Sequence, residues 1–194
     1  MAARPDRRTQ ILDAALDAFA AGGLATMTID EILRRSGAST GSLYHHFGCK
    51  EDLAGALYVA GLRSYQETAI RTLERHPDAE EGVRAYVANY VRWIESNPRW
   101  ARYLLEMRGT ESVVAMEPDI REINDRFFGA LRHWLESHIR AGRIVKLAPE
   151  LYAAIITGPL HEWARQHLAG RAQAGPRTAA RALGDAAWRA LAVR

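Results

Sequence analysis

Apolar side chains recur every three or four positions along most of the chain, which is the spacing of helices that bury one face. Five prolines stand where one such pattern ends and the next begins, the place where a missing backbone N–H costs least. No segment shows the strict alternation of a half-buried strand. We therefore predict an all-α protein of about nine helices. The five prolines are Pro77, Pro98, Pro118, Pro149 and Pro176.

The helices expected after residue 50 are mostly long. The pattern predicts helices over about 50–75, 78–96, 98–108, 118–141, 149–168 and 176–192. Pro159 falls inside one of them, directly after Gly158, and is expected to kink it. The segment AGRAQAGP, residues 169–176, is predicted to be a loop.

Two short helices around a tight turn are predicted for residues 28–50, TIDEILRRSGASTGSLYHHFGCK. Thr28 and Glu31 have the spacing of a capping box, in which the Thr28 hydroxyl accepts from the Glu31 N–H and the Glu31 carboxylate accepts from the Thr28 N–H. Gly37 suits the left-handed residue that ends the first helix, and Ser39 can cap the second. This helix-turn-helix pattern is typical of DNA-binding domains.

The second short helix should present a polar face to the outside. Leu43 and Phe47 are four residues apart and are expected to face inward. Lys50 falls in the first turn of the next helix, where a cation opposes the helix dipole, so we expect an external phosphate to bind it. The outward residues are small, hydroxyl-bearing or aromatic, which suits contact with base edges and phosphates. They are Thr40, Gly41, Ser42, Tyr44, His45 and His46.

Over about its first 60 residues the chain resembles the tetracycline-repressor (TetR) family of bacterial transcription regulators, in which a lead helix precedes a helix-turn-helix and a lysine opens the fourth helix. Beyond them it resembles the family only in architecture. The resemblance implies a DNA-binding domain over 1–50 and a helical ligand-binding and dimerisation domain over 51–194. It also implies that Thr28, Thr40, Gly41, Ser42, Tyr44, His46 and Lys50 lie at or near DNA, and Ser39 and His45 complete the predicted set. Cys49 departs from the family pattern, because a thiol caps a helix more weakly than serine or asparagine.

Charge adds little to this interpretation. The formal net charge of the 194 residues is +3, and residues 1–50 hold six basic against five acidic side chains. Arg4, Arg7 and Arg8 cluster at the amino end, either as DNA contacts or as a solvated arm. One cysteine excludes an intrachain disulfide, and the sequence contains neither a bilayer-spanning run nor a signal peptide. A cytoplasmic protein is expected.

Aromatic residues recur at helical spacing in the second half of the chain. Such stripes are typical of an ordinary helical core, and they also suit the wall of a pocket for a small apolar or aromatic ligand. In the resembled family the ligand sits among these middle helices. The predicted ligand-binding residues are Tyr65, Trp93, Trp100, Tyr103, Met107, Phe127, Trp134 and His161.

The sequence offers no enzyme active site. His45 and His46 are adjacent, so on a helix they diverge by about 100 degrees and do not chelate one metal. His133 and His138 lack metalloprotease spacing, and there is no glycine-rich phosphate loop. We predict no catalytic residue, no metal and no cofactor.

The favoured interpretation is a homodimeric repressor that leaves its operator when a small molecule binds. An activator or a ligand-independent regulator stays open, as does, more remotely, a helical small-molecule-binding protein without DNA function. The dimer is expected to form through helices 149–168 and 176–192. The interface residues expected are Ile155, Ile156, Leu160, Leu183, Ala187, Ala190 and Leu191.

Overall fold

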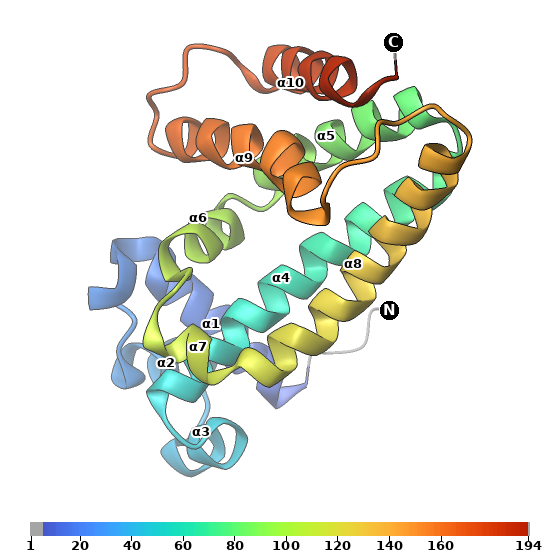
Figure 1. Ribbon diagram of the computed structural model, residues 1–194. Coiled ribbons are helices and arrows are strands. Elements are labelled where there is room, and N and C mark those ends of the chain that lie inside the picture. The colour runs from blue at the N-terminus through green and yellow to red at the C-terminus, as the bar shows by residue number, and fades with distance from the viewer. Residues whose placement is uncertain (1–5, 194) are drawn as a thin grey trace, which may run out of the picture. The chain divides into compact units, whose positions relative to one another are not determined.

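The computed structural model describes residues 6–193, and their secondary structure is helical (Figure 1). Within that range the only β-type pairing is an isolated antiparallel bridge between Ile144 and Ala192. The predicted all-α class is therefore confirmed. The elements are α1 (Arg7–Gly22), the 3-10 turn η1 (Gly23–Ala25), α2 (Ile29–Ser36), α3 (Thr40–Phe47), α4 (Lys50–Arg75), α5 (Ala79–Ser96), α6 (Pro98–Met107), α7 (Glu111–Ala115), α8 (Glu117–Arg140), α9 (Pro149–Leu168) and α10 (Pro176–Leu191).

Proline marks the predicted helix starts closely. Helices α6, α9 and α10 begin at Pro98, Pro149 and Pro176, where the missing N–H would have been unpaired in any case. Helix α5 begins two residues after Pro77, because the Asp78 carboxylate accepts from the Glu81 N–H at 3.0 Å and acts as its cap. Among the described residues, neither the five-residue α7 nor the three-residue η1 was expected, since so short an element shows no period.

The chain divides into two compact units. Unit 1 holds the residues up to Leu62 together with Arg99–Arg121, and unit 2 holds Arg63–Pro98 together with the residues from Glu122 onward. Helices α4 and α8 each contribute residues to both units. The helix-turn-helix therefore belongs to a unit that also includes α6 and α7.

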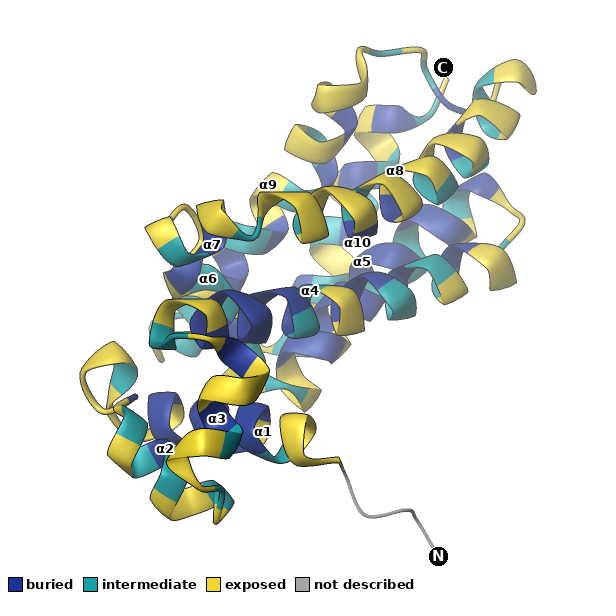
Figure 2. Ribbon diagram, turned by 90° about the horizontal axis from the view of Figure 1, so that it is seen from below, coloured by how far each residue is buried: buried dark blue, intermediate teal, exposed yellow. Residues whose placement is uncertain are grey.

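The core of unit 1 forms where α1 meets the start of α4. Tyr103 of α6 is fully buried there, packs edge-on against Phe19 with ring centroids 4.8 Å apart, and donates from its hydroxyl to the Ala54 carbonyl at 2.8 Å. Gly55 of α4 permits close packing of α7, because a Cβ atom at this position would lie 2.7 Å from the Ser112 carbonyl oxygen. Figure 2 shows the resulting concentration of buried residues on α1 and early α4.

Helix α5 is the centre of unit 2, where α9 and α10 pack against it and Arg84 forms an ion pair with Asp185 of α10. At the same amino-terminal end of α5, the Trp134 indole of α8 lies over Gly82 and donates to the His76 carbonyl at 3.1 Å.

Two indole rings of unit 2 stand against imidazole rings. The Trp134 and His138 centroids are 4.3 Å apart, and Trp163 stacks on His167 at 4.7 Å. The His167 imidazole in turn contacts the Glu95 carboxylate, with an Nε2 to Oε1 distance of 2.6 Å.

The structure corrects the predicted outward faces of α9 and α10. Ala187 and Leu191 are buried within the chain because α10 lays that side along α5, and Ile156 and Leu160 of α9 are buried as well. These four residues are therefore core residues of one subunit. The exposed side of α10 carries Ala182, Ala186 and Ala190, and that of α9 carries Ala154 and Gly158. Helix α9 continues through Pro159 without a break in its assignment.

Candidate nucleic-acid interface and ligand site

The turn between α2 and α3 is built as the sequence predicts. The Thr28 hydroxyl accepts from the Glu31 N–H at 3.3 Å, and the Ser39 hydroxyl accepts from the Ser42 N–H at 3.1 Å. Gly37 has a left-handed backbone with φ of 63°, and its N–H donates to the Leu33 carbonyl at 2.9 Å. Both predicted caps and the predicted stop are confirmed.

The other half of the expected capping box is wrong. The Glu31 carboxylate accepts hydrogen bonds from the guanidinium groups of Arg34 and Arg35, at 2.6 to 2.7 Å, and the Thr28 N–H donates to the Thr26 carbonyl instead. Three charge-assisted bonds from two guanidinium groups outcompete one bond from a neutral N–H. Hydrogen bonding to Arg34 and Arg35 lowers the pKa of Glu31 from 4.5 to about 2.

The outer face of α3 is open to solvent. Leu43 and Phe47 are buried at 0% and 5% exposure, which fixes the inward side of the helix. Figure 2 shows exposed segments on α2 and α3. The predicted residues Thr28, Ser39, Thr40, Gly41, Tyr44, His45 and His46 are exposed, while Ser42 and Lys50 are partly buried.

Two of these residues have no bonding partner among the described residues, and a third has open space beside its backbone. Tyr44 is 45% exposed, and within residues 6–193 neither its hydroxyl nor the Lys50 ammonium has a hydrogen-bond or ion-pair partner. A Cβ atom added at Gly41 would meet no atom within 4 Å, so another molecule can approach the backbone closely there. The face combines free donors with room for a partner.

Two of the amino-terminal arginines hold the helix-turn-helix together. Arg7 donates to the Ser36 carbonyl at the end of α2, at 3.3 Å, and the Arg8 guanidinium lies 5.2 Å from the centroid of the Phe47 ring. Arg4, the third of the cluster, lies outside the described residues. The sequence predicted these arginines to be either DNA contacts or a solvated arm, and neither prediction included packing. Their contacts link α1 to α2 and α3.

Cys49 caps the helix that Lys50 opens. The thiol sulfur accepts from the Asp52 N–H at 3.3 Å, so the position that departs from the family pattern still supplies a capping atom, although a weak one. Lys50 follows at the first position of α4, beside acidic Glu51 and Asp52.

Four of the side chains predicted to form a ligand site, Tyr65, Trp93, Phe127 and His161, meet in unit 2, and Tyr90 joins them. The Tyr65 ring lies 5.4 Å from Tyr90, 5.6 Å from Trp93 and 6.5 Å from Phe127 between centroids, and Tyr90 lies 5.7 Å from His161. The Tyr65 hydroxyl donates to the Tyr86 hydroxyl at 3.1 Å. Burial raises the pKa of Tyr65 well above its ordinary value. We call Tyr65, Tyr86, Tyr90, Trp93, Phe127 and His161 the aromatic cluster.

The remaining predicted ligand residues lie elsewhere. Trp134 packs over Gly82 and against His138 and has no ring contact with the aromatic cluster. Tyr103 and Met107 belong to the core of unit 1, and the Trp100 ring closes over Gly61 in the same unit. The structure thus divides the predicted set between three environments.

Sequence reasoning overlooked several polar residues of unit 2. The Gln66 amide donates to the Asn124 side chain at 2.8 Å, and α4 and α5 line a pocket with three arginines. A usable signal was present, because Thr68, Arg71, Thr72 and Arg75 repeat at helical spacing on one side of α4.

Metal and membrane sites are absent from the part of the chain that the structure describes. There, no three His, Cys, Asp or Glu side chains gather as a metal site would require. In the same part, no helix combines the length and the apolarity that crossing a bilayer demands.

Comparison with known proteins agrees with the helix-turn-helix geometry. A family model described as bacterial regulatory proteins of the tetR family matches residues 11–57. The transcriptional repressor KstR2 of Rhodococcus jostii is 33% identical over 118 residues, 52% of this chain and 57% of that protein. The transcriptional activator FasR of Mycolicibacterium smegmatis is 34% identical over 106 residues, 53% of this chain and 47% of that one. The chain thus spans about half the length of these curated relatives.

The fold has a counterpart among solved structures. A TetR family transcription regulator from Marinobacter aquaeolei matches with a TM-score of 0.80 at 21% identity, over 97% of this chain and 96% of that one. The family model covers the segment that holds α2, α3 and Lys50, and the solved structure extends the likeness to the remaining helices. Residues 11–57 thus match the tetR family of bacterial regulatory proteins, and the chain as a whole shares the fold of a TetR family transcription regulator.

Proposed function

We propose that the protein is a homodimeric transcriptional repressor that binds a pseudo-palindromic operator with α3 and leaves it when a small molecule binds in unit 2. The observation that carries the DNA part is the open face of α3, where buried Leu43 and Phe47 hold the polar side outward and Lys50 stands free at the start of α4. Such a face suits a recognition helix in a major groove. A cytoplasmic location belongs to this proposal, since the operator is there.

The DNA contacts divide into two kinds. Lys50 and Tyr44 are assigned to phosphates, while Thr40 and Ser42 are assigned to base edges. Removing one phosphate contact should weaken binding to every sequence and flatten the dependence of log affinity on log salt by about one unit. Removing a base contact should instead change which sequence is preferred.

The chain offers a matched control for the phosphate assignment, because Lys50 and Lys146 are its only lysines. Lys50→Ala should flatten the salt dependence on specific and random duplexes, whereas Lys146→Ala, in an exposed loop, should leave it as in the wild type. Equal slopes for wild type and Lys50→Ala would remove the phosphate assignment. Thr40→Ala should alter the ranking of operator variants at constant salt.

A dimer would present two recognition helices to the two half-sites of the operator. The exposed small residues Ala154, Gly158, Ala182, Ala186 and Ala190 support pairing through α9 and α10, because they permit close helix approach. Ala186→Arg should give monomers in sedimentation and weaken operator binding. Ala141→Arg, which adds the same charge at an exposed turn, should remain dimeric. A wild-type monomer at micromolar concentration would refute the dimer.

Ligand release is the remaining part. Helix α4 contributes its first turns to unit 1 and its later turns to unit 2, over about 39 Å of helix, and so joins Lys50 to Tyr65 of the aromatic cluster. A ligand that prefers the non-operator geometry by about 1 to 3 kcal/mol would lower operator affinity about 5- to 150-fold. Linkage requires operator DNA to weaken ligand binding by the same factor.

Ligand release is tested by measuring whether ligand and operator DNA weaken each other's binding by the same factor. Apolar and aromatic compounds are screened by thermal shift, and each ligand is then titrated with and without operator DNA. Equal factors in both directions support the repressor mechanism. A compound bound at the aromatic cluster that leaves operator affinity unchanged would favour the ligand-independent alternative. The activator alternative has the FasR likeness in its favour, and a reporter gene separates it from repression by the sign of the response.

A further inference from the structure

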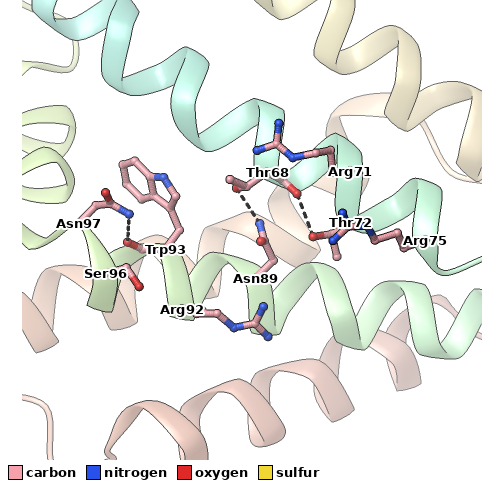
Figure 3. Close-up of a pocket in the computed structure, with 9 residues that line it drawn as sticks. All are labelled: Thr68, Arg71, Thr72, Arg75, Asn89, Arg92, Trp93, Ser96 and Asn97. Atoms are coloured by element: carbon pink, nitrogen blue, oxygen red, sulfur yellow. Dashed lines mark hydrogen bonds between the residues drawn. The ribbon is translucent and has the colours of Figure 1, made fainter. Parts of the chain in front are cut away.

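Unit 2 contains a pocket of about 310 Å³ between α4 and α5, within the range of about 300 to 1,000 Å³ typical of small-molecule sites (Figure 3). Helix α4 supplies one wall and α5 the other, each from positions spaced three or four residues apart. The lining residues are Thr68, Arg71, Thr72, Arg75, Asn89, Arg92, Trp93, Ser96 and Asn97.

The lining is strongly basic. It contains three arginines and no carboxylate. Among the described residues Arg75 and Arg92 have no ion-pair partner, and Arg71 has only a long contact of 3.8 Å with Glu67, on side chains that are both about half exposed. A concave surface with charge of one sign focuses its field and attracts ions of the other sign.

Internal hydrogen bonds hold the walls in place. The Asn89 side chain is 7% exposed and donates to the Thr68 hydroxyl at 3.2 Å, and the Thr72 hydroxyl donates to the Thr68 carbonyl at 2.8 Å. The Asn97 amide donates to the Trp93 carbonyl at 3.0 Å. Figure 3 shows these three bonds along the two helices.

One donor in the lining is unsatisfied. The indole Nε1 of Trp93, a residue 6% exposed, is buried without a hydrogen-bond partner, and Figure 3 places it on the ring edge that faces α4. Buried N–H groups are nearly always paired in folded proteins, so an orphan at a pocket wall points to an acceptor that is bound from outside.

We propose that this α4–α5 pocket binds a small organic anion, a molecule with a carboxylate or phosphate group and an apolar part that packs on the Trp93 ring. Arg75 and Arg92 pair with the anionic group, and Trp93 Nε1 donates to one of the acceptor atoms of the ligand. Of the predicted ligand residues, only Trp93 lines this pocket. The proposal does not depend on whether ligand binding releases DNA.

Isothermal titration calorimetry with phenyl phosphate and phenylacetate, in Tris–chloride at fixed ionic strength, tests the site. At least one probe should bind once per chain, whereas the uncharged analogue benzyl alcohol should not. The double variant Arg75→Gln/Arg92→Gln should weaken binding at least about tenfold, because charge-assisted hydrogen bonds to the anion are lost. Arg132→Gln/Arg140→Gln removes the same charge from exposed arginines of α8 that lie outside the lining, and should bind as the wild type does.

Four outcomes would overturn the proposal: no saturable binding of either anion, equal binding of benzyl alcohol, equal loss in both double variants, or displacement of the bound probe by random duplex DNA. The last would assign the arginines to nucleic acid. Trp93→Phe keeps a ring and removes the donor, so it should weaken binding of the anion several-fold at a temperature where its unfolding transition shows the variant to be folded. Unaltered affinity in Trp93→Phe would remove the indole from the site.

Discussion

Helices α3 and α5 both carry tyrosines and other polar aromatic residues, yet the two helices use them in opposite ways. Tyr44 on α3 is 45% exposed and its hydroxyl has no partner among the described residues, whereas Tyr86 on α5 is 5% exposed and its hydroxyl is bonded to that of Tyr65. The same residue type therefore stabilises the fold on α5 and remains available to another molecule on α3. Whether a polar group is already bonded within the chain distinguishes the two uses better than residue type does.

The largest expected effect comes from deleting one tyrosine on each helix. Tyr86→Ala should lower the free energy of unfolding by about 3 to 5 kcal/mol, because a buried ring leaves a cavity. Tyr44→Ala should change it by less than about 0.5 kcal/mol while it weakens DNA binding. Urea unfolding of both variants measures the difference. A comparable loss of stability in Tyr44→Ala would show that α3 is also a structural face.

Glycine gives a second paired test. A Cβ atom at Gly82 of α5 would overlap the Trp134 ring and approach the His76 carbonyl, so Gly82→Ala should cost about 1 to 3 kcal/mol. Gly41→Ala on α3 meets open space and should stabilise the helix by up to about 1 kcal/mol. Thermal unfolding of the two variants should therefore give shifts of opposite sign. Operator affinity should fall in Gly41→Ala, because the methyl group stands on the proposed DNA face.

The buried hydroxyl pair predicts a smaller effect that depends on both partners. Tyr65→Phe or Tyr86→Phe alone should cost about 0.5 to 1.5 kcal/mol, because each leaves the other hydroxyl buried without its bond. The double variant should cost less than the sum of the two. A double-mutant cycle measured by urea unfolding gives this coupling. Strict additivity would mean that the hydroxyl pair contributes no mutual stabilisation.

The smallest effect is the pH dependence of the helix-turn-helix surface. The pKa of Glu31 is about 2 in the folded protein and 4.5 ordinarily, so the carboxylate stabilises the fold above pH 4.5 and this contribution is lost as pH falls from there towards 2. Glu31→Gln should therefore flatten the fall in melting temperature over this window. Glu111→Gln, at a residue with no ion pair among the described ones, serves as the control. An equal slope in wild type and Glu31→Gln would show that the two arginine contacts contribute nothing.

Interactions within four residues of the chain were largely predictable from the sequence. The Thr28 and Ser39 caps and the left-handed Gly37 depend on near neighbours, so residue type and spacing suffice to place them. The capping box failed at Glu31 because two arginines compete for one carboxylate. Spacing alone does not rank such competitors.

Features that require two helices to meet were less predictable. Helix α10 has small or apolar residues on both sides, so its period does not say which side faces α5, and Leu191 was assigned to the wrong one. The aromatic stripes predicted the correct helices but not which stripes pack against one another. Tyr103 and Trp134 were therefore wrongly grouped with Tyr65 in the predicted ligand site. The α4–α5 pocket depends on how α4 and α5 are aligned along each other. A single sequence does not reveal this alignment.

The pairing of indole with imidazole rings in unit 2 has a spectroscopic consequence. A protonated imidazole quenches the emission of a neighbouring indole more strongly than a neutral one does, and Trp134 and Trp163 each stand against a histidine. Burial lowers the pKa of His138, so its quenching of Trp134 should set in only below the pH at which an exposed histidine becomes charged. Trp134, one of the five tryptophans, therefore acts as a built-in pH indicator. A fluorescence titration with an acidic ligand must hold pH constant before a change in brightness is read as occupancy.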